Sequence, residues 1–160
     1  NKEWKDALTA LDAINKNKDF FGKEREKRAE AAFKMGVVLD ELKQPGEANQ
    51  AYLSVVSTYA AFHDWVTQAW ERYIPNSLAD FEKMPVVTPI DKTAKRMREL
   101  ALYKITQKYL YQWQKLTDED APSGALRRLR RDIVELKAKL KVTPEEELVI
   151  LTELGIAPAK

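Results

Sequence analysis

The residue types that carry out most enzyme chemistry are sparse in this sequence. It contains one histidine, His63, and no cysteine, so it cannot build a thiol nucleophile, a disulfide or a thiolate metal site. A single histidine near a helix start is more often a surface or capping residue than a general base. A zinc site made of several histidines is excluded by the count.

Neighbouring carboxylates occur at two places that could suggest acid–base or metal chemistry. Asp40-Glu41 lies within a helical pattern, where such pairs are common and do not indicate catalysis without geometry. Asp118-Glu119-Asp120 lacks the glycine and the ligand spacing of a calcium loop, and we interpret it as a solvated loop before a helix. The five glycines are scattered and form no phosphate-binding loop. We therefore predict no enzyme and no catalytic, cofactor-binding or metal-binding residue.

The densest charge feature is a group of four arginines: Arg127, Arg128, Arg130 and Arg131. They fall in residues 91–141, which hold 14 Lys or Arg against 7 Asp or Glu. Such a basic helix could bind nucleic acid or an anionic membrane surface. The alternative is a solvated helix face whose arginines pair with carboxylates such as Asp132 and Glu135. Helical geometry favours the alternative, because it spreads the arginines to both sides of the helix's apolar stripe.

The elements that would position these residues are helices, because apolar residues recur at spacings of three and four along most of the chain. Proline at 75 predicts a break in the fourth helix, and Thr88 and Thr143, each followed by proline, predict helix starts. No segment alternates with period two, so we predict no sheet. The predicted helices are residues 3–14, 23–42, 47–60, 65–74, 89–116, 125–141 and 144–154, with a short helical turn at 78–84. The predicted apolar side of the helix at 89–116 is Met97, Ala101, Ile105, Tyr109 and Trp113, and that of the helix at 125–141 is Leu126, Leu129, Ile133, Leu136 and Leu140.

Two of these helical patterns follow each other in the sequence between Ala32 and Tyr59. They are joined by a short turn at residues 43–46 that contains Pro and Gly. If the two helices are antiparallel, Gly36 and Ala48 face each other, and small residues there let the backbones approach. The apolar positions of the pair are Ala32, Met35, Gly36 and Leu39, then Ala48, Ala51, Tyr52, Val55, Val56 and Tyr59.

This spacing resembles a tetratricopeptide repeat. Met35-Gly36 match the apolar-Gly pair of that family, and Leu39, Ala48 and Tyr52 match the positions that follow. The match is incomplete: Ala32 stands where a large residue is usual, Val55 replaces an alanine, and the closing proline is missing. Ala69-Trp70 follow 34 residues after Met35-Gly36, but Trp70 replaces the glycine. An ordinary helical hairpin remains the alternative.

The resemblance implies an all-α fold of antiparallel helical hairpins, a TPR-like α-solenoid over residues 1–84 with additional C-terminal helices over 85–160. It also implies a non-catalytic scaffold that binds a protein or peptide partner in a groove lined by the first helix of each repeat. The partner-binding residues carried over from the family are Glu30, Phe33, Lys34, Val37, Asp40, Glu41, Thr67, Glu71 and Ile74.

The rival hypothesis is a basic helical module that binds nucleic acid or an anionic membrane surface through residues 91–141. No zinc pattern or aromatic-rich strand indicates a nucleic-acid-binding fold, so we do not expect a nucleic-acid partner. No apolar run approaches the roughly 18 residues of a membrane span, so we predict no transmembrane segment. Pairing of the arginines with nearby carboxylates is favoured over binding to a membrane surface, so we do not expect a membrane-surface partner. The sequence leaves the cellular compartment open.

Overall fold

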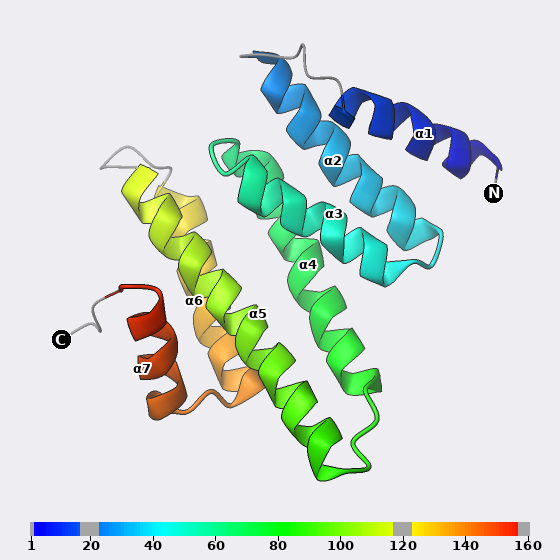
Figure 1. Cartoon of the computed structure of the whole chain (residues 1–160). Coiled ribbons are helices and arrows are strands. Elements are labelled where there is room, and N and C mark those ends of the chain that lie inside the picture. The colour runs from blue at the N-terminus through cyan, green and yellow to red at the C-terminus, as the bar shows by residue number, and fades with distance from the viewer. Residues whose placement is uncertain (1, 17–22, 117–122, 157–160) are drawn as a thin grey trace. The chain divides into compact units, whose positions relative to one another are not determined.

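In the computed structural model, the described residues are 2–16, 23–116 and 123–156, and they form α-helices without a strand (Figure 1). The all-α fold class is therefore confirmed for this part of the chain. The helices are α1 (Lys2–Lys16), α2 (Lys23–Glu41), α3 (Pro45–Thr58), α4 (His63–Lys83), α5 (Pro89–Leu116), α6 (Ser123–Leu140) and α7 (Pro144–Glu153).

The chain divides into two compact units, Asn1–Leu78 and Ala79–Lys160. In the first unit, α2 packs against both α1 and α3, and consecutive helices reverse direction. The buried residues of α2 include Ala29, Ala31 and Ala32, whose small side chains let neighbouring helices approach closely. The fully or nearly fully buried side chains of this unit include Ala29, Ala32, Leu39, Ala48, Tyr52, Val55, Val56, Val66, Ala69 and Trp70.

The predicted break at Pro75 is wrong, because α4 continues through this residue to Lys83. A proline inside a helix removes one backbone hydrogen bond and crowds the preceding turn. Here Tyr73 and Ser77, on either side of it, are buried, and Asn76 donates a hydrogen bond to Asp40. These tertiary contacts hold the chain helical where local propensity alone would end it.

Within the turn predicted at residues 43–46, the chain reverses at Lys43, and Pro45 and Gly46 already belong to α3. Lys43 has a φ of 61°, in the left-handed region. The amide of Lys43 donates to the carbonyl of Asp40, and that of Gln44 donates to the carbonyl of Leu39. This is the Schellman pattern, which satisfies the last carbonyls of a helix.

The second unit contains α5, α6 and α7, with both shorter helices packed on α5 (Figure 1). The predicted apolar stripe of α6 is buried from Leu129 to Leu140, whereas the side chain of Leu126 lies outside the described residues. The predicted stripe of α5 is only partly correct, because Met97 and Ala101 are exposed. The side of α5 that is buried consists of Leu102, Tyr103, Thr106, Tyr109 and Trp113.

Both predicted threonine starts are confirmed. At α5, the side chain of Thr88 accepts from the amide of Asp91 (3.2 Å), and the Asp91 carboxylate accepts from the Thr88 amide (2.9 Å). At α7, Thr143 and Glu146 make the same reciprocal pair. Each arrangement is a capping box, which satisfies two amides that a helix start leaves without partners. The acidic loop at residues 118–120 lies outside the described residues.

Candidate functional site

The α2–α3 hairpin is organised around Gly36 and the ring of Tyr52. A Cβ atom placed on Gly36 would lie 2.6 Å from Cδ1 and 2.8 Å from Cζ of Tyr52, well inside van der Waals contact. The close approach that the sequence predicted between Gly36 and Ala48 is thus made by an aromatic ring against the glycine. Tyr52 is fully buried and Ala48 is as well, so both still belong to the packed face of α3.

The carboxylate of Asp40 joins three helices of the first unit. Its Oδ2 accepts a hydrogen bond from the hydroxyl of Tyr52 on α3 (2.7 Å), and its Oδ1 accepts one from Nδ2 of Asn76 on α4 (2.9 Å). Burial, followed by the hydrogen bond to Asp40, raises the pKa of Tyr52. Asp40 therefore serves as an internal acceptor that fixes the positions of α3 and α4 against α2.

An aromatic group lies beside this network. The ring centroid of Phe33 is 5.8 Å from that of Tyr52 and 5.8 Å from that of Trp65, with tilted planes in both pairs. Such offset contacts are favoured by the ring quadrupoles. Phe33 remains half-buried, so one part of the ring packs on its neighbours and another part is accessible.

The nine predicted groove residues differ in their exposure to solvent. Lys34, Glu41 and Glu71 are exposed, and Lys34 forms an ion pair with Glu30 (2.6 Å). Thr67 donates its hydroxyl to the carbonyl of His63 (2.8 Å), which keeps it on its own helix. The half-buried members are Glu30, Phe33, Val37, Asp40, Thr67 and Ile74. The assignment of these nine residues to a partner groove stays a prediction.

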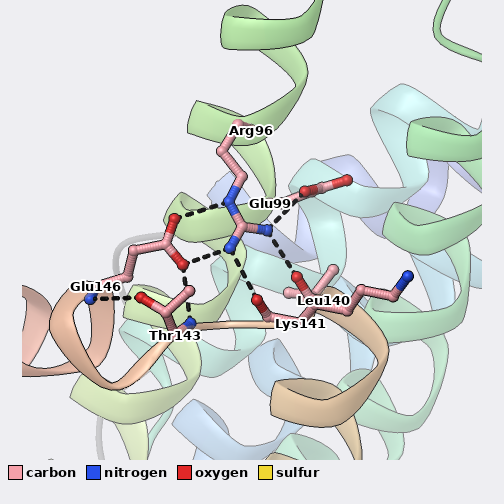
Figure 2. A network of polar contacts seen from close by, with 6 residues as sticks. All are labelled: Arg96, Glu99, Leu140, Lys141, Thr143 and Glu146. Atoms are coloured by element: carbon pink, nitrogen blue, oxygen red, sulfur yellow. Dashed lines mark hydrogen bonds and ion pairs between the residues drawn. The ribbon is translucent and has the colours of Figure 1, made fainter.

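Arg96 is the centre of the polar network in the second unit (Figure 2). Its Nε donates to Oε1 of Glu146 (2.9 Å), and Nη2 donates to the other oxygen of that carboxylate. Nη1 donates to Glu99 (3.0 Å) and to the carbonyl of Leu140 (2.6 Å), and Nη2 also donates to the carbonyl of Lys141 (3.1 Å). One guanidinium thereby ties α5 to the end of α6 and the start of α7.

The carboxylate of Glu146 is shared between this network and the capping box of α7. Hydrogen bonds from Arg96 and then from the amide of Thr143 lower the pKa of Glu146. Lys141, at the turn, has a φ of 50°, so the chain ends α6 in the same left-handed manner as at Lys43. Every donor of Arg96 described above has an acceptor within the chain, so the network holds the junction of α6 and α7 against α5.

A second polar cluster links the same three helices through Glu147. Its two oxygens accept from the hydroxyl of Tyr103 (2.6 Å) and from Nζ of Lys137 (2.6 Å). Burial alone would raise the pKa of Glu147, but the hydrogen bonds from Lys137 and Tyr103 outweigh it and the pKa is lowered. Tyr103 also accepts from Gln107 (2.7 Å). This cluster likewise fixes α6 and α7 on α5.

A surface groove runs between α5 and α7, and sequence reasoning did not predict it. Arg96 contacts Glu146 and Lys104 contacts Glu153, so α7 runs in the same direction as α5 along it. One part of the groove encloses about 510 Å³ and is lined mainly by apolar side chains that include Met97, Leu100 and Val149. A second part, of about 640 Å³, is lined by Lys104, Ile105, Lys108, Tyr111, Gln112, Lys115, Glu153 and Leu154. Leu148 and Val149 are exposed on α7, and the sequence does not indicate which side of this helix stays uncovered.

The arginines of α6 all lie on the exposed side of the helix, while Leu129, Ile133 and Leu136 face the core. Arg131 lies 3.7 Å from Asp132 and 3.9 Å from Glu135. Burial raises the pKa of Asp132, with a partly offsetting effect of Arg131. The basic helix is thus packed through its apolar stripe.

The single histidine and most of the acidic side chains can be placed within the described residues. His63 is half-buried at the start of α4, where burial lowers its pKa and neighbouring Asp64 partly offsets this. Across residues 2–16, 23–116 and 123–156, no set of three or more acidic or histidine side chains could hold a metal ion. Within the same ranges, no helix combines the length and apolar character needed to cross a lipid bilayer.

Comparison with known proteins identifies no relative: no family model, no curated protein and no solved structure matches this chain. The class of the molecule is therefore given by its own structure. The described residues define an all-α protein of two units, in which buried aromatic rings and polar networks centred on Asp40, Arg96 and Glu147 hold the helices of each unit together.

Proposed function

We propose that this chain is a non-catalytic helical scaffold that binds a protein or peptide partner on the face shared by α2 and α4, in the manner of a tetratricopeptide repeat array. The observation that supports this most directly is that some residues of α2 make internal contacts while others on the same helix stay accessible. Gly36 and Asp40 fix α2 to α3 and α4 from within, while Phe33 and Val37 stay half-buried and Lys34 stays exposed beside them. A rigid helix with accessible apolar and charged side chains is a suitable surface for peptide recognition.

The test is affinity purification of bound proteins from the source cell with the wild-type chain and a double variant, Lys34→Glu with Glu71→Lys. Both side chains are exposed, so the variant should fold normally, whereas a change at Asp40 would break the internal network. A matched control reverses two exposed charges elsewhere, Glu82→Lys with Lys139→Glu. We expect a defined set of proteins to be retained by the wild type and the control and lost by the α2/α4 variant.

The same experiment can contradict the proposal. If all three chains retain the same proteins, the α2/α4 face is not the binding surface. If duplex DNA or anionic vesicles bind the wild type tightly and compete with every retained protein, the basic-module hypothesis for residues 91–141 is correct instead.

A further inference from the structure

We propose that the groove between α5 and α7 is a second docking site, which takes a peptide segment of a partner protein carrying apolar residues followed by carboxylates. This site lies in the second unit and is independent of the α2/α4 face. It rests on the way the lining of the groove changes from apolar to basic along α5.

The apolar half results from incomplete packing of α7 on α5. Ile150 lies on the buried face of α7 and is 5% exposed. Val149 beside it is 56% exposed, and Met97 of α5, across the groove, is 67% exposed. Together with Leu100 and Ala101 they line one continuous concavity. Apolar side chains that stay this accessible in a concave site favour burial against a partner.

The basic half begins where α7 ends. Lys104 and Glu153, 2.6 Å apart, belong to both halves, and beyond them α5 extends past the end of α7. Lys108 and Lys115 line this half and are exposed, and Lys115 lies over the ring of Tyr111, 4.4 Å from its centroid. Among the described residues that line this half, the only carboxylate is that of Glu153, which already contacts Lys104. Charge complementarity therefore favours an acidic occupant.

The same argument gives the orientation of the occupant. Glu145 lines the apolar half, at the opposite end of the groove from Lys108 and Lys115, so carboxylates of a bound segment would be repelled at one end and attracted at the other. Lys115 follows Met97 by 18 residues, which is about 27 Å of helix. An extended peptide of about eight residues spans that length.

The test starts from an unbiased library of displayed peptides of about 12 residues, long enough to span the groove, selected on the full chain. We expect the selected peptides to combine apolar residues with two or more Asp or Glu. Binding of a synthesised winner, measured by fluorescence anisotropy, should weaken by about tenfold or more in Met97→Glu, which places a charge in the apolar half. It should weaken similarly in Lys108→Glu with Lys115→Glu, and in a peptide whose acidic residues are changed to the corresponding amides.

The altered side chains are exposed, and circular dichroism of each variant checks that it folds. The variant Lys34→Glu with Glu71→Lys serves as the control and should bind the peptide like the wild type, which separates this site from the α2/α4 face. Selection of no peptide, of peptides without carboxylates, or of peptides indifferent to both groove variants would refute the acidic-peptide site. A concentration-dependent dimer in sedimentation that Met97→Glu dissociates would assign the groove to a second copy of the chain, and this too would overturn the proposal.

Discussion

Gly36 on α2 is in direct contact with the ring of Tyr52 on α3, so closely that a Cβ atom at position 36 would overlap the ring. A glycine in the middle of a helix costs about 1 kcal/mol relative to alanine when nothing else changes. The contact explains why the helix nevertheless has glycine here, because any side chain would displace Tyr52 from its place against Asp40.

Gly36→Ala should therefore destabilise the protein, by about 1–3 kcal/mol in the free energy of unfolding, as overpacking of a core usually does. Chemical denaturation followed by circular dichroism measures this. In a Tyr52→Leu background the same change should become neutral or stabilising, because the ring is gone and only the helix propensity of alanine remains. An equal effect of Gly36→Ala in both backgrounds would show that the two residues are not coupled.

The left-handed residues Lys43 and Lys141 offer a second measurement. A non-glycine residue in this conformation costs roughly 1–2 kcal/mol, and glycine relieves part of that cost. We expect Lys43→Gly and Lys141→Gly each to raise the melting temperature, with a gain of up to about 1 kcal/mol. Gly155, after α7, has a φ of 66° and is already a glycine in the left-handed conformation, so Gly155→Ala should lower the melting temperature. Unchanged melting temperatures for both lysine variants would mean that these turns are not under the strain described.

The junction around Arg96 predicts a dependence of stability on pH. The pKa of Glu146 is lower in the folded chain than its ordinary value, so this carboxylate contributes stability above about pH 5 that is lost as the pH falls toward its folded pKa. Arg96→Met removes the chief cause of the lowered pKa. The variant should be less stable at neutral pH, by about 2 kcal/mol, because Glu146 and two backbone carbonyls lose a donor.

The difference in the free energy of unfolding between wild type and Arg96→Met should shrink as the pH is lowered from about pH 5 to about pH 3. Protonation of Glu146 then weakens its interaction with Arg96 in the wild type as well. Hydrogen exchange of the α6 and α7 amides at neutral and acidic pH reports the effect within the second unit. Arg96→Lys is the matched control: it keeps the charge but not the forked geometry, and should recover only part of the loss. A difference that stays constant with pH would disprove the role assigned to the Glu146 pair.

Apolar spacing and local capping chemistry predicted most of the helices, because these signals lie within a few residues of each other. The helix starts at Thr88 and Thr143 depend only on a threonine and a carboxylate three residues later. The error at Pro75 has the opposite origin. There the deciding contact, from Asn76 to Asp40, joins residues far apart in sequence and opposes the local preference of proline.

The groove could not be predicted for a related reason. Along α5, apolar residues occur on more than one side, and spacing alone does not tell which side a neighbouring helix covers. Which side of α5 is covered depends on where α7 lies along it. That position is fixed by the ion pairs of Arg96 with Glu146 and of Lys104 with Glu153. The two pairs join residues that are 50 and 49 positions apart in the sequence. Met97 was consequently predicted to lie on the apolar stripe of α5, whereas it is exposed.

The basic helix α6 gives the prediction that separates a scaffold from a charged-surface binder. Its apolar stripe from Leu129 to Leu140 is buried, so its arginines flank a packed face instead of lining a free one. Arg131 lies near two carboxylates, which reduces the positive potential available to phosphates. We expect at most weak binding to duplex DNA at about 0.15 M salt, without sequence preference and falling steeply as salt rises.

The double variant Arg127→Glu with Arg131→Glu should abolish that residual binding and leave the proteins retained by the α2/α4 face unchanged. Electrophoretic mobility shift over a salt series measures the first effect, and the affinity purification described above measures the second. Sub-micromolar DNA or anionic-vesicle binding at about 0.15 M salt, lost in the double variant, would show instead that residues 91–141 form the main binding surface. The salt series distinguishes weak residual binding from a main DNA-binding surface. The slope of log affinity against log salt concentration grows with the number of phosphates that the protein neutralises, so an extended surface gives the steeper slope.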